Sequence, residues 1–164
     1  MIRDMIPSDV DEITSVCNYY IRTSTATFEI DEHSPEEMGQ RLKEIKDAGL
    51  PVLVSVDEQS GRLSGYAYVH PWKARAAYSP TLEATVYLAP GHTGKGLGRE
   101  LTTALLKRTR SLGKYKSAIA CITANNAPSI ALVKSMGFEQ VSHFKSVGSK
   151  FGKTLDVVDF QIML

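Results

Sequence analysis

Three glycines and two basic residues lie together in one short segment, a combination suited to binding a phosphate. The segment is His92-Thr93-Gly94-Lys95-Gly96-Leu97-Gly98-Arg99, between a β-rich stretch and an amphipathic one. Glycines at alternating positions let a backbone approach a ligand closely, and the first N–H groups of a following helix are free to donate. A pyrophosphate would gain hydrogen bonds from these groups and charge from Lys95 and Arg99. The alternative is a merely flexible turn.

Two other nucleotide-binding motifs do not fit the sequence. A dinucleotide fingerprint, G-x-G-x-x-G, that begins at Gly94 needs glycine where Arg99 stands. A Walker A motif that ends in Gly152-Lys153-Thr154 needs glycine at Val147, and a strand-like run follows it where a helix is required. The glycine segment therefore indicates neither a Rossmann-type site nor a P-loop.

Glu83 is the second candidate for chemistry, in the β-rich stretch 81–88. Because side chains alternate between the faces of a strand, Glu83 shares its face with Thr81, Thr85 and Tyr87. Such a carboxylate could be a solvated surface group or a salt-bridge partner. Partial burial would instead raise its pKa toward neutrality and make it a better general base.

The remaining reactive side chains form no recognisable site. His33, His70, His92 and His143 lack metal-ligand spacing, and no serine lies in a G-x-S-x-G elbow. We predict neither a metal site nor a covalent nucleophile. Cys17 and Cys121 are far apart in the chain, and we expect two reduced thiols, each a small buried hydrophobe.

Length and composition predict one domain over 1–164. The chain has 164 residues, of which 43% are hydrophobic and 23% charged, and its formal net charge is +1. So small a charge does not favour a polyanion, and no stretch is long and apolar enough to suggest a membrane span or a signal peptide. We expect a cytoplasmic protein with no nucleic-acid or membrane partner.

Hydrophobic periodicity and turn signals predict the elements that must position these residues. Strands are predicted over 1–6, 51–56, 63–69, 81–88, 117–123, 138–144 and 154–163, and helices over 9–22, 34–49, 98–112 and 126–136. In the third helix, Leu101, Leu105, the stem of Arg108 and Leu112 should form the buried stripe. This order predicts an α/β (α+β) fold, with a mixed, mainly antiparallel sheet of about seven strands and helices on both faces.

The segment Thr93-Gly94-Lys95-Gly96-Leu97-Gly98 is similar to the pyrophosphate loop R/Q-x-x-G-x-G/A of the GNAT acetyltransferase superfamily, and the predicted order of elements matches that fold. Thr93 stands where the pattern has Arg or Gln, so we expect a weakened contact with the cofactor. The segments 24–28, 71–75, 81–83, 86–88, 126–138 and 147–152 further resemble phosphinothricin N-acetyltransferases and their methionine sulfoximine and sulfone relatives.

The resemblance implies transfer of an acetyl group from acetyl-CoA to a small amino-acid-like amine in a homodimer, with Glu83 as the general base. The cofactor residues it implies are Val86, Tyr87, Leu88, Gly94, Lys95, Gly96, Leu97, Gly98, Arg99, Asn126 and Ser129. The implied substrate residues are Phe28, Lys73, Arg75, Tyr78 and Glu83. Val133 replaces a tyrosine that protonates the thiolate in the family, so the general acid is unassigned.

Several alternatives stay open at this stage. Asn126 could simply cap a helix, Lys73 and Arg75 could be a surface charge pair, and Phe28 and Tyr78 could be core aromatics. The acceptor could be an ordinary amino acid, a polyamine or a protein N-terminus, although two cations disfavour a polyamine. A non-catalytic acyl-CoA sensor is the remaining possibility.

Overall fold

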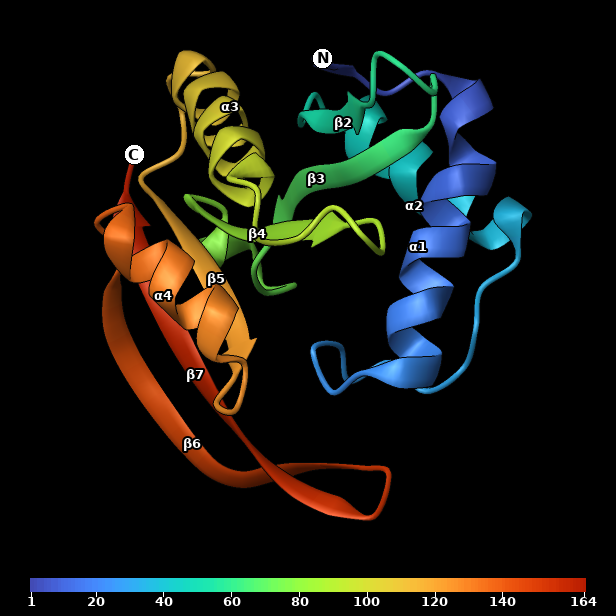
Figure 1. Ribbon diagram of the computed structural model, residues 1–164. Helices are drawn as coiled ribbons and strands as arrows, with labels where there is room; N and C mark the ends of the chain where they lie inside the picture. Colours follow the sequence, from blue (N-terminus) through green and yellow to red (C-terminus); the bar gives the residue numbers. More distant parts are fainter.

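A mixed sheet of seven strands forms the centre of the molecule, in a computed structural model that describes residues 1–164 (Figure 1). The strands are β1 (Ile2–Asp4), β2 (Val52–Val56), β3 (Leu63–Pro71), β4 (Thr81–Leu88), β5 (Ser117–Thr123), β6 (Glu139–Lys150) and β7 (Lys153–Met163). They lie in the order β1-β2-β3-β4-β5-β7-β6, and only β4 and β5 run parallel. The predicted fold class is confirmed.

Four helices cover the two faces of the sheet, two on each side (Figure 1). They are α1 (Val10–Thr23), α2 (Pro35–Asp47), α3 (Leu97–Ser111) and α4 (Ala127–Ser135), with short 3-10 turns at Pro7–Asp9 and Ala76–Tyr78. On one face, Tyr20 of α1 packs against Tyr87 of β4. On the other, Leu101 of α3 lies over Gly65 of β3. None of the helices combines the length and apolar character needed to cross a membrane.

The predicted helix starts are confirmed where capping residues mark them. Ser34 accepts a hydrogen bond from the Glu37 N–H, and the Glu37 side chain accepts one from the Ser34 N–H, which is a capping box at the start of α2. Asn126 caps α4 by accepting a hydrogen bond from the Ser129 N–H at 3.3 Å. These contacts involve only neighbours in the chain, so local sequence suffices to predict them.

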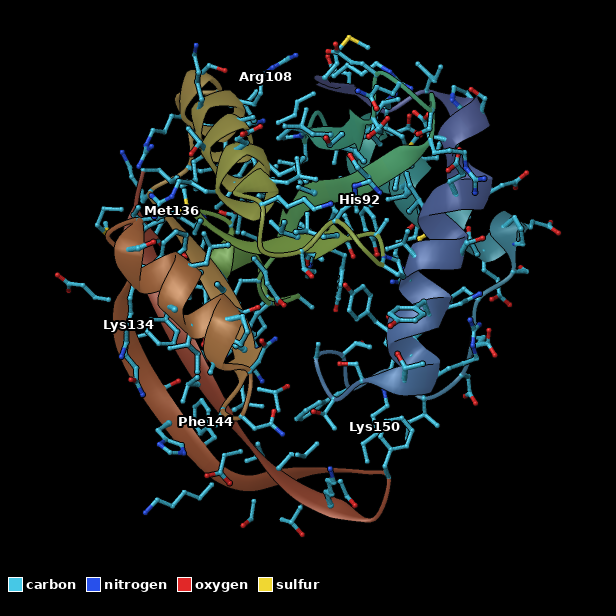
Figure 2. The ribbon with its side chains drawn as sticks, viewed as in Figure 1. His92, Arg108, Lys134, Met136, Phe144 and Lys150 are labelled. Atoms are coloured by element: carbon cyan, nitrogen blue, oxygen red, sulfur yellow. The ribbon has the colours of Figure 1, made fainter.

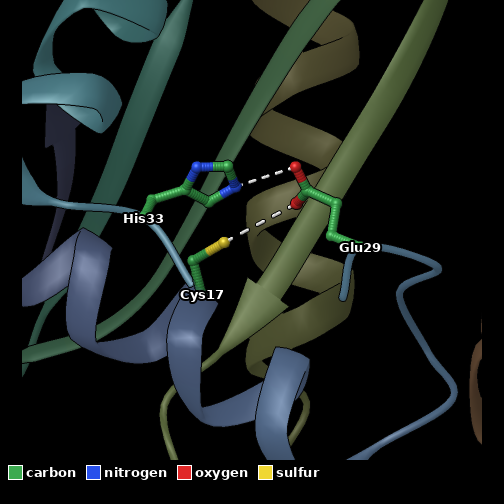
Figure 3. A group of neighbouring side chains, drawn as sticks. All are labelled: Cys17, Glu29 and His33. Carbon is green, nitrogen blue, oxygen red and sulfur yellow. Dashed lines mark hydrogen bonds and ion pairs between the residues drawn. The ribbon is translucent and has the colours of Figure 1, made fainter. Parts of the chain in front are cut away.

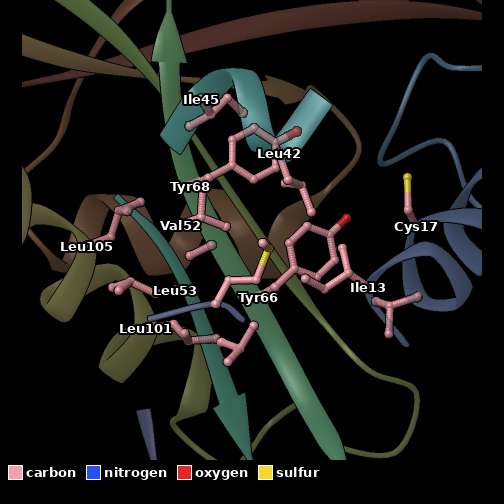
Figure 4. Close-up of a cluster of buried hydrophobic side chains, with 14 of the residues drawn as sticks. Ile13, Cys17, Leu42, Ile45, Val52, Leu53, Tyr66, Tyr68, Leu101 and Leu105 are labelled. Carbon is pink, nitrogen blue, oxygen red and sulfur yellow. The ribbon is translucent and has the colours of Figure 1, made fainter. Parts of the chain in front are cut away.

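The core consists of two clusters of buried side chains. The larger cluster surrounds β2, β3 and β4, and Figure 4 shows Tyr66 and Tyr68 near Leu42 of α2 with Leu101 and Leu105 of α3 on the other side. The smaller cluster lies between α4 and the strands β5 and β7. Each half of the sheet therefore has its own core, one on either side of the junction between β4 and β5.

Two details of the sequence prediction are wrong. The buried face of α3 also includes Thr102, Leu106 and Thr109, so its centre is rotated away from Arg108. Arg108 is exposed and donates to Asp4 at 2.8 Å (Figure 2). Leu112, also assigned to the stripe, is exposed. The strand predicted over 138–144 continues to Lys150, with two register shifts relative to β7.

We predict opposite effects on stability from alanine at two glycines. A Cβ at Gly65 would lie 2.9 Å from Leu101, Leu88 and the Tyr87 carbonyl oxygen, so Gly65→Ala should destabilise the protein by about 1–3 kcal/mol. A Cβ at Gly39, inside α2, would make an ordinary 3.5 Å contact with Val10. Gly39→Ala should therefore stabilise by about 0.5–1 kcal/mol. Urea unfolding measures both changes, and equal effects would contradict the packing around Gly65.

Candidate functional site

The parallel strands β4 and β5 separate after a short region of pairing. The paired residues are Thr81, Leu82 and Glu83 on β4, opposite 117–119 on β5. Beyond Glu83, β4 stays paired with β3 up to Leu88, while β5 stays paired with β7 up to Thr123. A gap therefore opens within the sheet, and Glu83 lies at its vertex.

The hydrogen-bond register shows which peptide groups face this gap. Ala89 N–H donates to Ser64 O at 2.9 Å and Trp72 N–H to Thr81 O at 3.3 Å, both across the β3–β4 pair. Because bonded and non-bonded residues alternate in an antiparallel pair, the odd-numbered residues of β4 point their peptide groups toward β3. Val86 and Leu88 therefore present N–H and C=O groups to the gap, whereas Tyr87 contributes only its ring.

One of these gap-facing groups already has a partner. The Tyr20 hydroxyl of α1 donates to the Leu88 carbonyl oxygen at 2.6 Å. Sequence analysis does not identify this contact, because it joins residues far apart in the chain. It leaves the N–H groups of Val86 and Leu88 as donors for a ligand that lies along β4.

The glycine loop leads into α3 with free backbone donors. Gly94 and Gly96 adopt positive φ angles of 73° and 84°, which glycine tolerates far better than other residues. The first intrahelical bond runs from Glu100 N–H to Gly96 O at 3.2 Å, so the three preceding helical N–H groups have no acceptor within the helix. These N–H groups and the helix dipole favour an anion at this end.

Two cations predicted from the sequence lie beside this entrance. The Lys95 ammonium donates to Gly91 O at 3.0 Å, and the Arg99 guanidinium donates to Ser135 Oγ at 2.6 Å. Both residues are exposed and neither forms an ion pair with a carboxylate. Thr93 is also exposed and adds no charge. The positive charges of Lys95 and Arg99 are therefore available to an incoming phosphate.

The start of α3 packs against the second half of α4, where Arg99 donates to Ser135 Oγ at 2.6 Å. Since β4 and β5 are parallel, the helices that follow them begin at the same edge of the sheet. A Cβ built on Gly98 would lie 3.2 Å from Leu132 of α4, which shows how closely the two helices pack. The predicted cofactor residues on the loop, on α3 and at Asn126 and Ser129 are thus gathered around one edge.

On the opposite face of the sheet, a pocket of about 590 Å³ lies between α1, α2 and the strands β3 and β4. Its lining includes Glu83, His70, Arg41, Thr85 and Tyr87. The pocket therefore reaches the vertex of the gap from the side away from α3 and α4.

Glu83 is half-buried in this pocket, with 27% of its side chain exposed. Its Oε2 lies 3.8 Å from His70 Nε2. Burial raises the pKa of Glu83 above its ordinary value of 4.5, although the charge of His70 opposes the shift. The raised pKa makes this carboxylate a better proton acceptor than an ordinary glutamate. The sequence alone does not reveal His70 as its neighbour, because the contact requires the pairing of β3 with β4.

The other predicted substrate residues lie outside the lining of the pocket. The Lys73 ammonium lies 4.3 Å from the ring centre of Trp72, whose ring also packs against Tyr78. Arg75 is exposed at the start of the 3-10 turn. Phe28 covers the backbone of Gly148 on β6 so closely that a Cβ there would overlap its ring.

The two cysteines differ in their exposure. Cys17 is buried, as predicted, but the same prediction is wrong for Cys121, which is exposed. Ala120 and Ile122 point toward α4 and are buried, whereas Cys121 points to the other face of β5. An apolar strand sequence does not reveal which of its two faces a helix covers.

A polar cluster in the pocket wall has donors of the kind that bind metals. Cys17, Glu29 and His33 approach one another, with His33 Nε2 at 2.9 Å from Glu29 Oε1 (Figure 3). The Arg41 guanidinium, however, donates to the same Glu29 oxygen at 2.7 Å. Burial would raise the pKa of Glu29, but the bonds from Arg41 and His33 lower it overall. Arg41 thus supplies the positive charge that this carboxylate needs.

Lys150 binds the loop that follows α1. The long β6–β7 hairpin extends below the gap toward the loop after α1 (Figure 1). There the buried Lys150 ammonium donates to Ser24 O at 2.8 Å and to Thr27 O at 2.9 Å (Figure 2). Thr123 Oγ1 of β5 donates to Thr25 O at 2.6 Å. These bonds connect α1 to the strands on the far side of the gap.

Comparison with known proteins gives consistent results. A family model described as an acetyltransferase (GNAT) domain matches residues 2–158. A phosphinothricin N-acetyltransferase from Alcaligenes faecalis is 39% identical over 98% of this chain and 80% of its own length. An L-methionine sulfoximine/L-methionine sulfone acetyltransferase from Pseudomonas paraeruginosa is 34% identical over 99% of this chain and 94% of its own.

A solved structure agrees with these sequence matches. It is a GNAT superfamily phosphinothricin acetyltransferase from Sinorhizobium meliloti in complex with acetyl-CoA. The two structures superpose with a TM-score of 0.96, and their sequences are 35% identical. The match covers 100% of this chain and 88% of the Sinorhizobium meliloti chain.

We predict that Lys150→Met loosens the loop at 24–28. The variant removes the ammonium that bonds two carbonyl groups, so it should destabilise the protein by about 1–3 kcal/mol. Hydrogen exchange should speed up at the amides of residues 24–28. Lys153→Met, an exposed site on the same hairpin, is the matched control and should change neither property. Equal exchange in both variants would show that Lys150 does not hold the loop.

Proposed function

This chain belongs to the GNAT acetyltransferase family, and we propose that it acetylates the amino group of a small amino-acid-like acceptor such as phosphinothricin, methionine sulfoximine or methionine sulfone. It is an acetyl-CoA-dependent N-acetyltransferase. The observation that carries the proposal is the gap between β4 and β5, which has an anion-binding helix start at one edge and a carboxylate of raised pKa at its vertex.

The residues around the gap fit acetyl-CoA, which supplies an acetyl group activated as a thioester. The helical N–H groups at the start of α3, with Lys95 and Arg99, suit its pyrophosphate. The N–H groups of Val86 and Leu88 suit the amide-bearing arm, as an added strand would pair with β4. Asn126 uses its side-chain oxygen to cap α4, which leaves its amide NH₂ free for the same arm.

Glu83 is the proposed general base. An amine arrives mostly as ammonium at neutral pH, and it must lose a proton before its nitrogen can attack. Glu83 faces the pocket on the side away from the pyrophosphate loop, so it can meet an acceptor that enters there. It takes the proton directly or through one water. A backbone N–H directed into the gap can donate to the thioester oxygen as negative charge develops on it.

The acceptor's acidic group needs a cation, and Lys73 and Arg75 are the proposed ligands. Both lie on the loop before β4, which is joined to that strand by the bond between Trp72 N–H and Thr81 O. Arg75 forms a bidentate pair with a phosphinate or carboxylate, and Lys73 adds a point charge. Phe28 and Tyr78, each more than a third exposed, supply apolar surface beside the acceptor.

A thiol-release assay with acetyl-CoA tests the function. The acceptors are phosphinothricin, methionine sulfoximine, methionine sulfone, ordinary amino acids, an N-terminal peptide and spermidine. Turnover should be fastest with one of the first three. Tight acetyl-CoA binding without turnover of any amine would contradict the proposal and favour a non-catalytic acyl-CoA sensor.

We predict that Glu83→Gln lowers kcat by about 10²- to 10⁴-fold, because it removes a general base, and leaves acetyl-CoA affinity unchanged. Folding shifts the pKa of Glu83 upward, so the stability it contributes is present below its ordinary pKa and is lost as pH rises through the raised value. At pH 7 the variant should therefore be at least as stable as the wild type. Steady-state kinetics measure the change in kcat. Thermal melting of both proteins between pH 4 and 8 measures the change in stability. A loss of stability at pH 7 would contradict this account.

We also predict that Thr93→Arg strengthens acetyl-CoA binding by up to about tenfold, because it adds a guanidinium beside the proposed pyrophosphate site. The effect should shrink as salt concentration rises. His92→Arg, which adds the same charge one residue earlier, is the matched control and should have a smaller effect. Isothermal titration with acetyl-CoA measures the affinities, and equal gains from both variants would indicate only a general charge effect.

A further inference from the structure

Asp159 on β7 carries a buried carboxylate that is not fully satisfied within the protein. The residue is 8% exposed, and its Oδ1 is buried without any hydrogen-bond partner. Asp159 forms no ion pair either. A buried carboxylate oxygen without a partner costs folding free energy, so such a group points to a ligand that completes it.

The sheet brings Asp159 to the same face as Glu83. Glu83 pairs with Ile119 on β5, and Cys121, two residues further along, lies on the same face as Ile119. Cys121 in turn pairs with Asp159 on β7. Glu83, Cys121 and Asp159 therefore form a diagonal row across three adjacent strands, starting at the vertex of the gap.

The electrostatics of Cys121 agree with this arrangement. Desolvation by the surrounding strands raises the pKa of its thiol, and the negative charges of Glu83 and Asp159 raise it further. Both carboxylates are thus close enough to influence one thiol. Cys121, between the two carboxylates, is itself exposed, so the middle of the row is open to solvent. The only basic side chain paired with any of the three is His70, beside Glu83.

We propose that Glu83 and Asp159 together bind the ammonium group of the acceptor amine. This inference rests on the proposed function and names a second acidic ligand for the same acceptor. An ammonium has several N–H donors, so it can bond both carboxylates at once. Asp159 holds and orients the nitrogen, and Glu83 takes the proton: one N–H bond breaks, an O–H bond forms on Glu83, and the nitrogen keeps the electron pair.

This arrangement predicts selectivity for acceptors that carry a charged amino group. The ammonium would place one positive charge beside two carboxylates and donate to Asp159 Oδ1, so its removal from the ligand should weaken binding. The acidic group of the acceptor would bind elsewhere, at the cations on the loop before β4. Sequence analysis does not identify Asp159, because its proximity to Glu83 depends on the pairing of β5 with β7.

The test compares two ligands on two proteins by isothermal titration, with CoA bound in place of acetyl-CoA so that no reaction occurs. The ligands are phosphinothricin and its analogue without the amino group. Asp159→Asn should bind phosphinothricin at least about tenfold more weakly than the wild type does, because it loses a charge-assisted hydrogen bond. The analogue without the amino group should bind both proteins equally or bind the variant more tightly.

Asp156→Asn is the matched control, because it removes one negative charge from the same strand at an exposed pair with His143. It should leave both affinities unchanged. Asp159→Asn should fold with a melting temperature no lower than that of the wild type, since it removes an unpaired buried charge. Asp159→Ser provides a second variant with the same expected loss of affinity if the first does not fold.

The outcomes separate this inference from the proposed function. Equal affinity of wild type and Asp159 variants for phosphinothricin, with turnover intact in the wild type, would overturn the role of Asp159 alone. A loss of affinity for both ligands would overturn it as well, because the effect would not depend on the ammonium. If the wild type binds phosphinothricin through Asp159 but acetylates no amine, the binding site stands and the enzymatic function fails. If it binds neither ligand, both proposals are wrong.

Discussion

The structure depends on the early end of the pairing between β4 and β5. Every buried peptide group needs a hydrogen-bond partner, and a sheet normally supplies it from the next strand. Here the pairing stops at Glu83, while β3 and β7 keep the two strands apart on either side. The Tyr20 hydroxyl satisfies the Leu88 carbonyl. The remaining groups of the gap can be satisfied by a strand-like ligand, so the proposed binding site follows from an interruption in the sheet.

The position of Glu83 at the vertex explains how one residue can be both rigid and accessible. Its backbone is paired with β3 on one side and β5 on the other, so its side chain starts from a fixed point. Val86 and Leu88, further along β4, are paired with β3 but no longer with β5. The general-base role proposed for Glu83 would benefit from such a rigid origin, because small displacements of a catalytic group lower the rate strongly. The separate cores of the two half-sheets hold this vertex in place.

The sequence was sufficient where function depends on neighbours in the chain, and insufficient where it depends on strand pairing. The glycine loop, the Ser34 capping box and the Asn126 cap involve contacts within a few residues, and the structure has the helix starts where the pattern predicts them. The exposure of Cys121 and the burial of Asp159 depend on which strands are adjacent and on which face the helices cover. Lys73 shows a third limit: its charge is evident from sequence, but its position over the Trp72 ring is not.

In the proposed reaction, the distribution of charge would orient the two reactants, although the whole chain has a net charge of only +1. Lys95 and Arg99 lie with the helix start of α3 at one edge of the gap, and Glu83 lies at the vertex on the opposite face. A polyanionic cofactor is attracted to the first region and repelled by the second, whereas an ammonium is attracted to the second. The positive region near Lys95 and Arg99 therefore favours entry of the cofactor, and the negative region near Glu83 favours entry of the amine from the opposite face. This separation needs no net charge, and for that reason composition alone does not reveal it.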